Sequence, residues 1–195
     1  MIRRFPNFAL TLLLNTIYVA ALLVLAPWIL YRRLVHRKNR RGWKQKLLGK
    51  VPRRHGMRKC IWMHAVSVGE VNLLSPIIRQ FRKNSPNVEI WISTTTESGF
   101  ELAQQKYPEH RVFFCPADFS WAIHRTLRRV RPEMLVLAEL ELWPNLIRIA
   151  ADSGVKVAVV NARMSDSSFR GYWRFRHLLR PVFKRLSLVA GQNQL

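Results

Sequence analysis

Acidic residues are scarce in this chain. It carries 11 Asp and Glu against 33 Lys and Arg, and no acidic residue precedes Glu70. The formal net charge of +22 makes an anionic partner the expectation: nucleic acid, acidic lipid headgroups or a phosphorylated substrate. Because 15 of the 33 basic side chains come before Glu70, most of this excess belongs to the N-terminal part of the chain.

Cysteine is nearly absent too. Cys60 and Cys115 each lie in an apolar stretch, and neither a C-x-x-C pair nor a Cys/His metal pattern occurs. We therefore expect two buried free thiols, no metal site and no need for an oxidising compartment. The chain also lacks a G-x-G-x-x-G motif, so a dinucleotide-binding fingerprint is unsupported.

Charge is missing altogether from residues 8–30. A helix of that length covers the ~30 Å hydrocarbon layer of a bilayer. A cleaved signal peptide is the competing interpretation, but its apolar core is shorter, and the sequence around Trp28 and Tyr31 is a poor cleavage site. We predict one retained transmembrane helix, with residues 1–31 as a membrane anchor.

Basic residues follow this apolar run directly. Residues 32–59 contain 13 Lys or Arg and no acid, whereas only Arg3 and Arg4 lie on the other flank. The positive-inside rule then places the rest of the chain in the cytoplasm, with 32–59 as a basic juxtamembrane segment against anionic headgroups. A nucleic-acid-binding arm has a similar composition, but its position beside a span favours lipid, and no nucleic-acid motif is present.

From residue 60 onward, apolar runs alternate with helical patterns. Strands that are apolar throughout, alternating with helices, are typical of a parallel sheet covered on both faces. The predicted fold is therefore an α/β, Rossmann-like domain over residues 60–195. The predicted strands are 60–66, 88–93, 111–114, 134–138, 155–160 and 186–190; the predicted helices are 71–82, 98–106, 118–129 (capped by Asp118), 144–152 and 168–184.

Function in such sheets collects in the loops after the strands. After the first strand, Ser67 and Gly69 precede a helix whose free N–H groups favour an anion, and Gly69 allows a tight turn and close approach of a ligand. Glu70 sits at that helix start. It is either a catalytic base or an acid that stabilises the first turn electrostatically, and spacing alone favours the second role.

Three later loops carry further polar groups. Thr94 and Thr95 follow the second strand and suit either sugar binding or helix capping. Glu139 and Glu141 follow the fourth strand and face one side if that segment is extended. They need partners, either Arg163 or a lysine in a structural ion pair, or a ligand. Asn161 and Arg163, after the fifth strand, add an amide and a guanidinium.

Together these loops resemble the N-terminal half of the bacterial Kdo (3-deoxy-D-manno-octulosonic acid) transferases. The resemblance rests on HAVSVGE at 64–70, ELELWPN at 139–145 and NARMS at 161–165, with PAD at 116–118 and GY at 171–172. It runs from the anchor to the last residue, and its motifs occur in order and with the right spacing.

The resemblance implies a glycosyltransferase of the GT-B arrangement, with two Rossmann-like domains facing a cleft. Such enzymes move Kdo from CMP-Kdo onto the lipid A precursor (lipid IVA), invert the anomeric centre and use no known metal or cofactor. It implies Glu70 as the base. The acceptor would be held by this domain, through the loop residues named above, and phosphates by basic residues that include Arg170, Arg174 and Arg176.

Two further expectations follow. The family continues beyond the position of Leu195 into a C-terminal donor-binding domain, which is expected to be absent here and to be a required partner. The expected location is the inner membrane, single-pass, with the globular domain on the cytoplasmic face. The alternative function is a non-catalytic membrane module that binds anionic glycolipid.

Overall fold

A computed structural model describes residues 8–35, 41–141, 143–163, 166–174 and 176–191. The predicted residues 1–7 of the anchor, 36–40 of the basic segment, and Met164 and Ser165 of the NARMS string lie outside this description. The helices are α1 (Phe8–Val35), α2 (Trp43–Leu48), α3 (Val68–Asn84), α4 (Glu97–Lys106), α5 (Ser120–Val130), α6 (Pro144–Asp152), α7 (Asp166–Arg174) and α8 (Arg176–Phe183). The strands are β1 (Cys60–His64), β2 (Glu89–Thr94), β3 (Arg111–Phe114), β4 (Met134–Leu137), β5 (Lys156–Ala162) and β6 (Leu188–Gly191).

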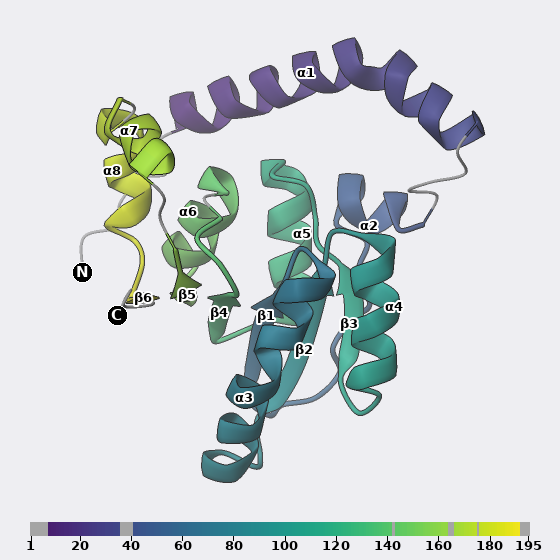
Figure 1. Cartoon of the computed structure of the whole chain (residues 1–195), viewed down its shortest axis with the longest axis vertical. Coiled ribbons are helices and arrows are strands. Elements are labelled where there is room, and N and C mark those ends of the chain that lie inside the picture. The colour runs from purple at the N-terminus through teal and green to yellow at the C-terminus, as the bar shows by residue number, and fades with distance from the viewer. Residues whose placement is uncertain (1–7, 36–40, 142, 164–165, 175, 192–195) are drawn as a thin grey trace.

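The strands form one parallel sheet in the order β3-β2-β1-β4-β5-β6 (Figure 1). This is the strand order of a Rossmann-like domain. All strands are parallel, and the order of connection switches from one side of the sheet to the other between β1 and β4. The predicted fold class is therefore confirmed. The helical stretch predicted over 168–184, with an interruption at Pro181, is two helices, α7 and α8, and Pro181 lies inside α8 instead of interrupting it.

Two apolar layers hold the sheet between its helices. Leu74 and Ile78 of α3, with Phe100 of α4, pack on one face. Ile123 of α5 and Ile147 of α6 pack on the other. The middle of the sheet is buried on both sides, which explains why its strands are apolar at consecutive positions. Cys60 and Cys115 are buried free thiols, as predicted.

The chain before β1 is part of this packed unit. The side chain of Val51 is fully buried in the core layer beneath α5. Arg54 is also buried, and its guanidinium donates to the carbonyls of Val130, Arg58 and Arg131. The described part of the segment predicted as juxtamembrane thus wraps the domain, and the packed unit begins near residue 41 rather than at residue 60.

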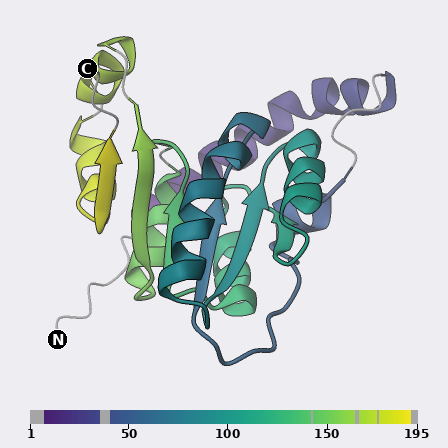
Figure 2. The same cartoon turned by 60° about the horizontal axis from the view of Figure 1, so that its bottom comes forward.

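Helix α1 crosses the same end of the domain as the first turns of α5 and α6, and both views show it there (Figures 1 and 2). Its Ala9–Trp28 portion has a mean hydropathy of 2.2, long and apolar enough by length and composition to cross a membrane. One narrow side of the helix is polar. Asn15 bonds to Ser120, Tyr18 donates to Asp118 at 2.9 Å, and Arg148 donates to Thr11 at 2.6 Å.

Strand β6 forms one edge of the sheet and is poorly covered. All four of its residues are exposed, with Leu188 at 58% and Val189 at 50%. On the α3 side of the sheet, an apolar hollow of about 470 Å³ extends from Phe81 across Val160 to Leu188. This part of the sheet has no helix over it among the described residues (Figure 2).

Candidate functional site

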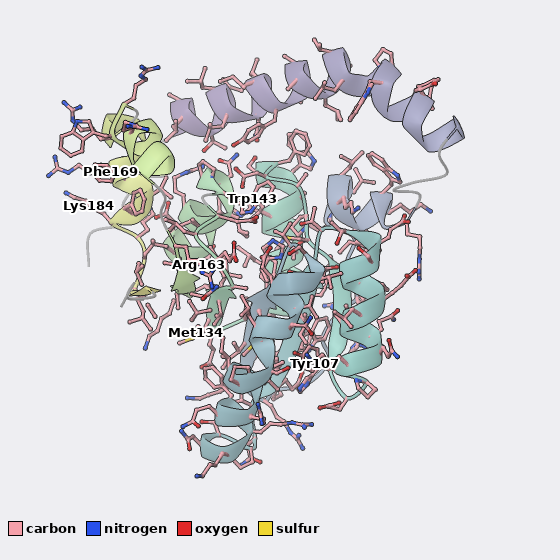
Figure 3. The ribbon with its side chains drawn as sticks, in the orientation of Figure 1. Tyr107, Met134, Trp143, Arg163, Phe169 and Lys184 are labelled. Atoms are coloured by element: carbon pink, nitrogen blue, oxygen red, sulfur yellow. The ribbon has the colours of Figure 1, made fainter. Side chains whose placement is uncertain are left out.

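The loops after β1, β2, β4 and β5 meet at the carboxyl edge of the sheet. The loops after β1 and β2 are joined directly, because the Thr96 hydroxyl donates to the Val66 carbonyl at 3.2 Å. The loop after β4 begins beside the loop after β1, where the Ala138 N–H donates to the His64 carbonyl. Parallel pairing therefore assembles the candidate site from segments separated by up to about 100 residues, and Figure 3 shows Arg163 at this end of β5.

Glu70 closes the first turn of α3. Ser67 is the N-cap, and its hydroxyl accepts from the Glu70 N–H. The Glu70 carboxylate reaches back, accepting from the Val66 N–H at 2.8 Å and from the Ser67 hydroxyl at 2.9 Å. These bonds form a variant of the capping box, in which the carboxylate accepts from the N–H of the residue before the N-cap. Spacing alone favours a structural role in the first turn, by electrostatic stabilisation. Glu70 is 7% exposed, so the carboxylate sits just beneath the surface of the edge.

Gly69 lies on that surface, in the first turn of the helix. It does not have a positive φ, and a Cβ there would meet only Ser67 Oγ, at 3.8 Å. The tight turn predicted at Gly69 is therefore wrong, since the backbone is ordinary helix. Its exposure leaves the amide end of α3 open, where helix N–H groups favour anions.

The threonines after β2 differ in their roles, since one caps a helix and another lies at the surface. Thr96, which the sequence reasoning missed, is the N-cap of α4 and accepts from the Gly99 N–H at 3.1 Å. Thr94 is fully buried and donates to the Thr96 carbonyl, whereas Thr95 is partly exposed. Of the two predicted ligand residues, Thr95 is thus the one at the surface. Ligand binding by either stays a prediction.

Glu139 and Glu141 do not lie on an extended strand. The chain turns after Leu137, and the Glu141 N–H donates to the Glu139 carbonyl at 2.8 Å, so the expected strand alternation does not apply. The Glu141 carboxylate accepts from the Trp143 indole at 2.9 Å. Among the described residues neither acid forms a salt bridge with Arg163, so the structural ion pair considered above is not formed.

Glu141 is electrostatically linked to Glu70. Burial raises the pKa of Glu141, and the negative charges of Glu70 and Glu139 raise it further, against the lowering effect of the Trp143 hydrogen bond. Like charges that raise a carboxyl pKa are typical of acid–base sites. The structure thus brings three predicted acids together: Glu70 in the first turn of α3, after β1, and Glu139 and Glu141 on the loop after β4.

Asn161 has a strained backbone. Its φ is +56°, in the left-handed region that Asn tolerates better than most residues, beside an irregularity in the pairing of β5 with β6. Its side-chain Nδ2 is buried and has no hydrogen-bond partner among the residues that the structure describes. A strained residue with an unsatisfied donor at a strand end is typical of a ligand site. Arg163, two residues later, is exposed.

His64, at the end of β1, is a buried residue that sequence reasoning left without a role. Its Nδ1 lies 2.9 Å from the Ser93 hydroxyl, and Nε2 is buried with no hydrogen-bond partner in the described part of the chain. Burial lowers the His64 pKa to about 4, so the ring is neutral at pH 7. Its place in the HAVSVGE string was the only available signal.

Asp118 caps a different helix from the predicted one. Its carboxylate accepts from the Asn145 and Leu146 N–H groups of α6 and from the Tyr18 hydroxyl, rather than capping α5. Burial raises the Asp118 pKa to about 6, opposed by these hydrogen bonds. The residue therefore joins α1, α5 and α6 below the edge that carries the acids.

No His, Cys, Asp and Glu side chains among the described residues come together in a group that could hold a metal ion. The three acids are close enough to influence one another's charge without forming such a group. The groups available for chemistry in this part of the chain are carboxylates, hydroxyls, an amide and a guanidinium. Such an arrangement can bind hydroxyl-rich and anionic ligands and accept a proton.

Comparison with known proteins agrees with these features. Residues 36–195 match the family model described as 3-Deoxy-D-manno-octulosonic-acid transferase (kdotransferase). The chain is 29% identical over 185 residues to the 3-deoxy-D-manno-octulosonic acid transferase of Chlamydia muridarum, covering 94% of this chain and 43% of that protein. It is 32% identical over 136 residues to the Haemophilus influenzae transferase of the same name, covering 69% of this chain and 32% of that protein.

A plant protein is similar as well. The probable mitochondrial 3-deoxy-D-manno-octulosonic acid transferase of Arabidopsis thaliana is 39% identical over 139 residues, covering 69% of this chain and 31% of that protein. The chain thus spans less than half the length of these curated relatives. The family model covers the whole packed domain, including the wrapped segment before β1. On this evidence the chain belongs to the Kdo transferase family.

Proposed function

We propose that this chain is the acceptor-binding half of an enzyme that transfers Kdo from CMP-Kdo to the lipid A precursor, lipid IVA. Family membership supports the reaction class. The observation that carries the proposal is the position of Glu70, at the open amide end of α3 and within electrostatic range of Glu141. The donor nucleotide would be bound by the part of the relatives that this chain does not span.

In the proposed step an acceptor hydroxyl oxygen bonds to the anomeric carbon of Kdo. The bond from that carbon to the CMP phosphate oxygen breaks, and its electron pair leaves with CMP. The hydroxyl proton passes to Glu70, so that charge and atoms balance. The transition state has oxocarbenium character, as in glycoside hydrolysis, and a nearby carboxylate also stabilises its positive charge.

The capping role of Glu70 is compatible with this step. An ionised carboxylate has about four acceptor positions on its two oxygens. Val66 and Ser67 supply one hydrogen bond to each oxygen, so each retains a lone pair for a substrate hydroxyl. The cap therefore fixes the direction of the carboxylate without exhausting it. Asn161, with its unpaired amide, would bind a substrate oxygen.

Attachment to the inner membrane, with the domain in the cytoplasm, belongs to the same proposal. The length and apolarity of α1 support it, as do the basic residues that follow. A single-pass arrangement, as the sequence predicts, would require α1 to leave its contacts with the domain. The contacts of α1 with Ser120, Asp118 and Arg148 also suit a helix that lies along the membrane surface with its polar side on the domain.

A non-catalytic module that binds anionic glycolipid is the second candidate. It is favoured by one observation, namely that the capping box alone accounts for the Ser67 and Glu70 contacts. The two candidates differ in whether Glu70 has a role that glutamine cannot fill. Glutamine can occupy the same place in a capping box, so a Glu70→Gln variant separates the roles.

The test supplies CMP-Kdo and lipid IVA to this chain together with a separately expressed C-terminal domain of a relative. We expect Glu70→Gln to lower the transfer rate by about 100-fold or more, the usual contribution of a general base, with little loss of stability. Glu133→Gln is the matched control, since Glu133 is exposed and lies before β4, at the opposite edge of the sheet. Equal transfer rates for Glu70→Gln and the unsubstituted chain would show that Glu70 is not the base. No product from either chain would favour the non-catalytic module.

A further inference from the structure

A cavity of about 470 Å³ lies between α1, α2 and the first turns of α5 and α6. Tyr18, Leu22 and Leu25 form the wall on α1, and Trp43 and Phe119 stand opposite. The volume is in the range of small-molecule sites in proteins, and the lining is mostly apolar. Neither the core packing nor the acids at the sheet edge account for this space.

One wall of the cavity is a helix whose outer side suits lipid. Leu23 and Val24, which face away from the cavity, are 68% and 78% exposed. Large apolar side chains exposed in this way along α1 are typical of a surface placed in a bilayer. A hydrocarbon chain could then pass from the bilayer beneath α1 into the cavity while remaining in apolar surroundings.

Two charged side chains, Lys46 and Asp118, also line the cavity. Lys46 is half-buried, with its ammonium 4.6 Å from the centroid of the Phe114 ring, and burial lowers its pKa. The charge of Glu97 acts on it in the opposite direction, but the described residues provide it with no salt bridge, so an anionic headgroup would complement it. The Asp118 carboxylate is already satisfied by Tyr18 and two amides of α6.

One residue, Trp143, connects the cavity to the candidate site. Trp143 lines the cavity, and its indole donates to Glu141. The negative charge of Glu70 in turn acts on Glu141 and raises its pKa. Figure 3 shows Trp143 between α5 and α6, on the side that faces α1. A lipid seated here would have its headgroup next to the loops that carry the acids.

We infer that this cavity binds one acyl chain of the lipid acceptor, with one phosphate of the disaccharide headgroup toward Lys46 and a hydroxyl of the same headgroup toward the carboxyl edge of the sheet. The inference rests on the proposed function for the identity of the lipid. It assigns α1 a direct part in acceptor binding, in addition to any role in attachment, because residues of α1 form one wall of the site.

The experiment measures binding of lipid IVA, and of its fully deacylated disaccharide, to the whole chain in detergent without CMP-Kdo. Ala21→Trp fills the cavity from α1. Ala20→Trp places the same side chain about 100° further round the helix, at an exposed position that does not line the cavity, and is the matched control. We expect Ala21→Trp to weaken lipid IVA binding at least tenfold, to leave binding of the disaccharide unchanged, and Ala20→Trp to change neither.

Equal lipid IVA affinity in the two tryptophan variants would overturn the inference. Ala21→Leu, a smaller addition, gives an intermediate loss if the cavity is occupied, and guards against a fold disturbed by tryptophan. Because the assay contains no donor, its result is independent of transfer. An inactive complex that still binds lipid IVA through the cavity would reject the proposed reaction and keep this inference.

Discussion

At the scale of single residues, burial shifts two titrating groups in opposite directions. Burial raises the pKa of Asp118 to about 6, and lowers that of His64 to about 4. Between pH 4 and 6, folded Asp118 holds a proton that the unfolded chain has released, so lowering the pH favours the folded state. Buried His64 stays neutral at pH values where the same residue in the unfolded chain takes up a proton. Lowering the pH below about 6.5 therefore disfavours the folded state through this group.

Replacing Asp118 removes one of these opposing effects. We expect Asp118→Asn to lose free energy of unfolding more steeply than the unsubstituted chain as pH falls from 6 to 4. The difference is about 3 kcal/mol, from a pKa change of about two units. Urea unfolding in mild detergent at several pH values measures it, after subtracting the constant cost of the altered cap.

His64→Gln is the converse control, because it should flatten the loss of stability below pH 6.5. Parallel pH profiles for Asp118→Asn and the unsubstituted chain would show that Asp118 titrates normally in the folded state. The buried placement of the carboxylate would then need revision.

At the scale of elements, two helices are capped by residues remote in the sequence. Asn15 of α1 accepts from the Ser120 N–H at the start of α5, 105 positions away. Asp118 caps α6 by accepting from the N–H groups of Asn145 and Leu146, which lie 27 and 28 positions later in the sequence. Neither helix has a capping side chain at its own N-cap. The first turns of α5 and α6 therefore depend on how α1 and the loop after β3 pack.

We expect Asn15→Leu to speed hydrogen exchange of the Ser120 amide by about tenfold. The substitution removes both bonds between these residues, and a typical net hydrogen bond contributes about 1 kcal/mol. Exchange measured by NMR or mass spectrometry reads the local opening. Thr16→Leu, on the exposed side of α1, should leave it unchanged. If both variants exchange alike, α1 does not cap α5.

These contacts mark the limit of what the sequence predicts. The strands and the sheet order follow from local apolar runs and from the general handedness of parallel crossovers, so they could be predicted. Motif strings brought Glu70, Glu139, Glu141 and Asn161 to the correct edge. The partner of Asp118, the turn at Glu139 and the positive φ of Asn161 depend on long-range packing, which local pattern does not contain.

At the scale of the whole molecule, the net charge of +22 is the dominant feature. It is not uniformly available to a membrane, because Arg54 is buried among backbone carbonyls and Arg129 donates to the Val51 carbonyl. Exposed residues such as Lys44 and Lys50 are free to face headgroups. The electrostatic part of lipid binding should therefore be smaller than the sequence total suggests.

We expect binding to vesicles with an anionic lipid to weaken at least tenfold between 0.1 and 0.5 M salt, because exposed charges are screened. Binding to neutral vesicles, through α1, should be almost independent of salt. A joint Lys44→Gln and Lys50→Gln substitution should reduce only the salt-dependent part, by up to about fivefold per residue. Vesicle sedimentation measures all three, and a salt-independent result on anionic vesicles would exclude an electrostatic contribution.

The exposed strand β6 has a practical consequence for anyone handling the protein. An edge whose backbone groups are available, next to an apolar hollow, is a template for adding strands from another chain. Concentrated samples should therefore self-associate through this edge even when α1 is shielded by detergent. A lysine introduced at Val189 would be a reasonable first step toward a monodisperse preparation.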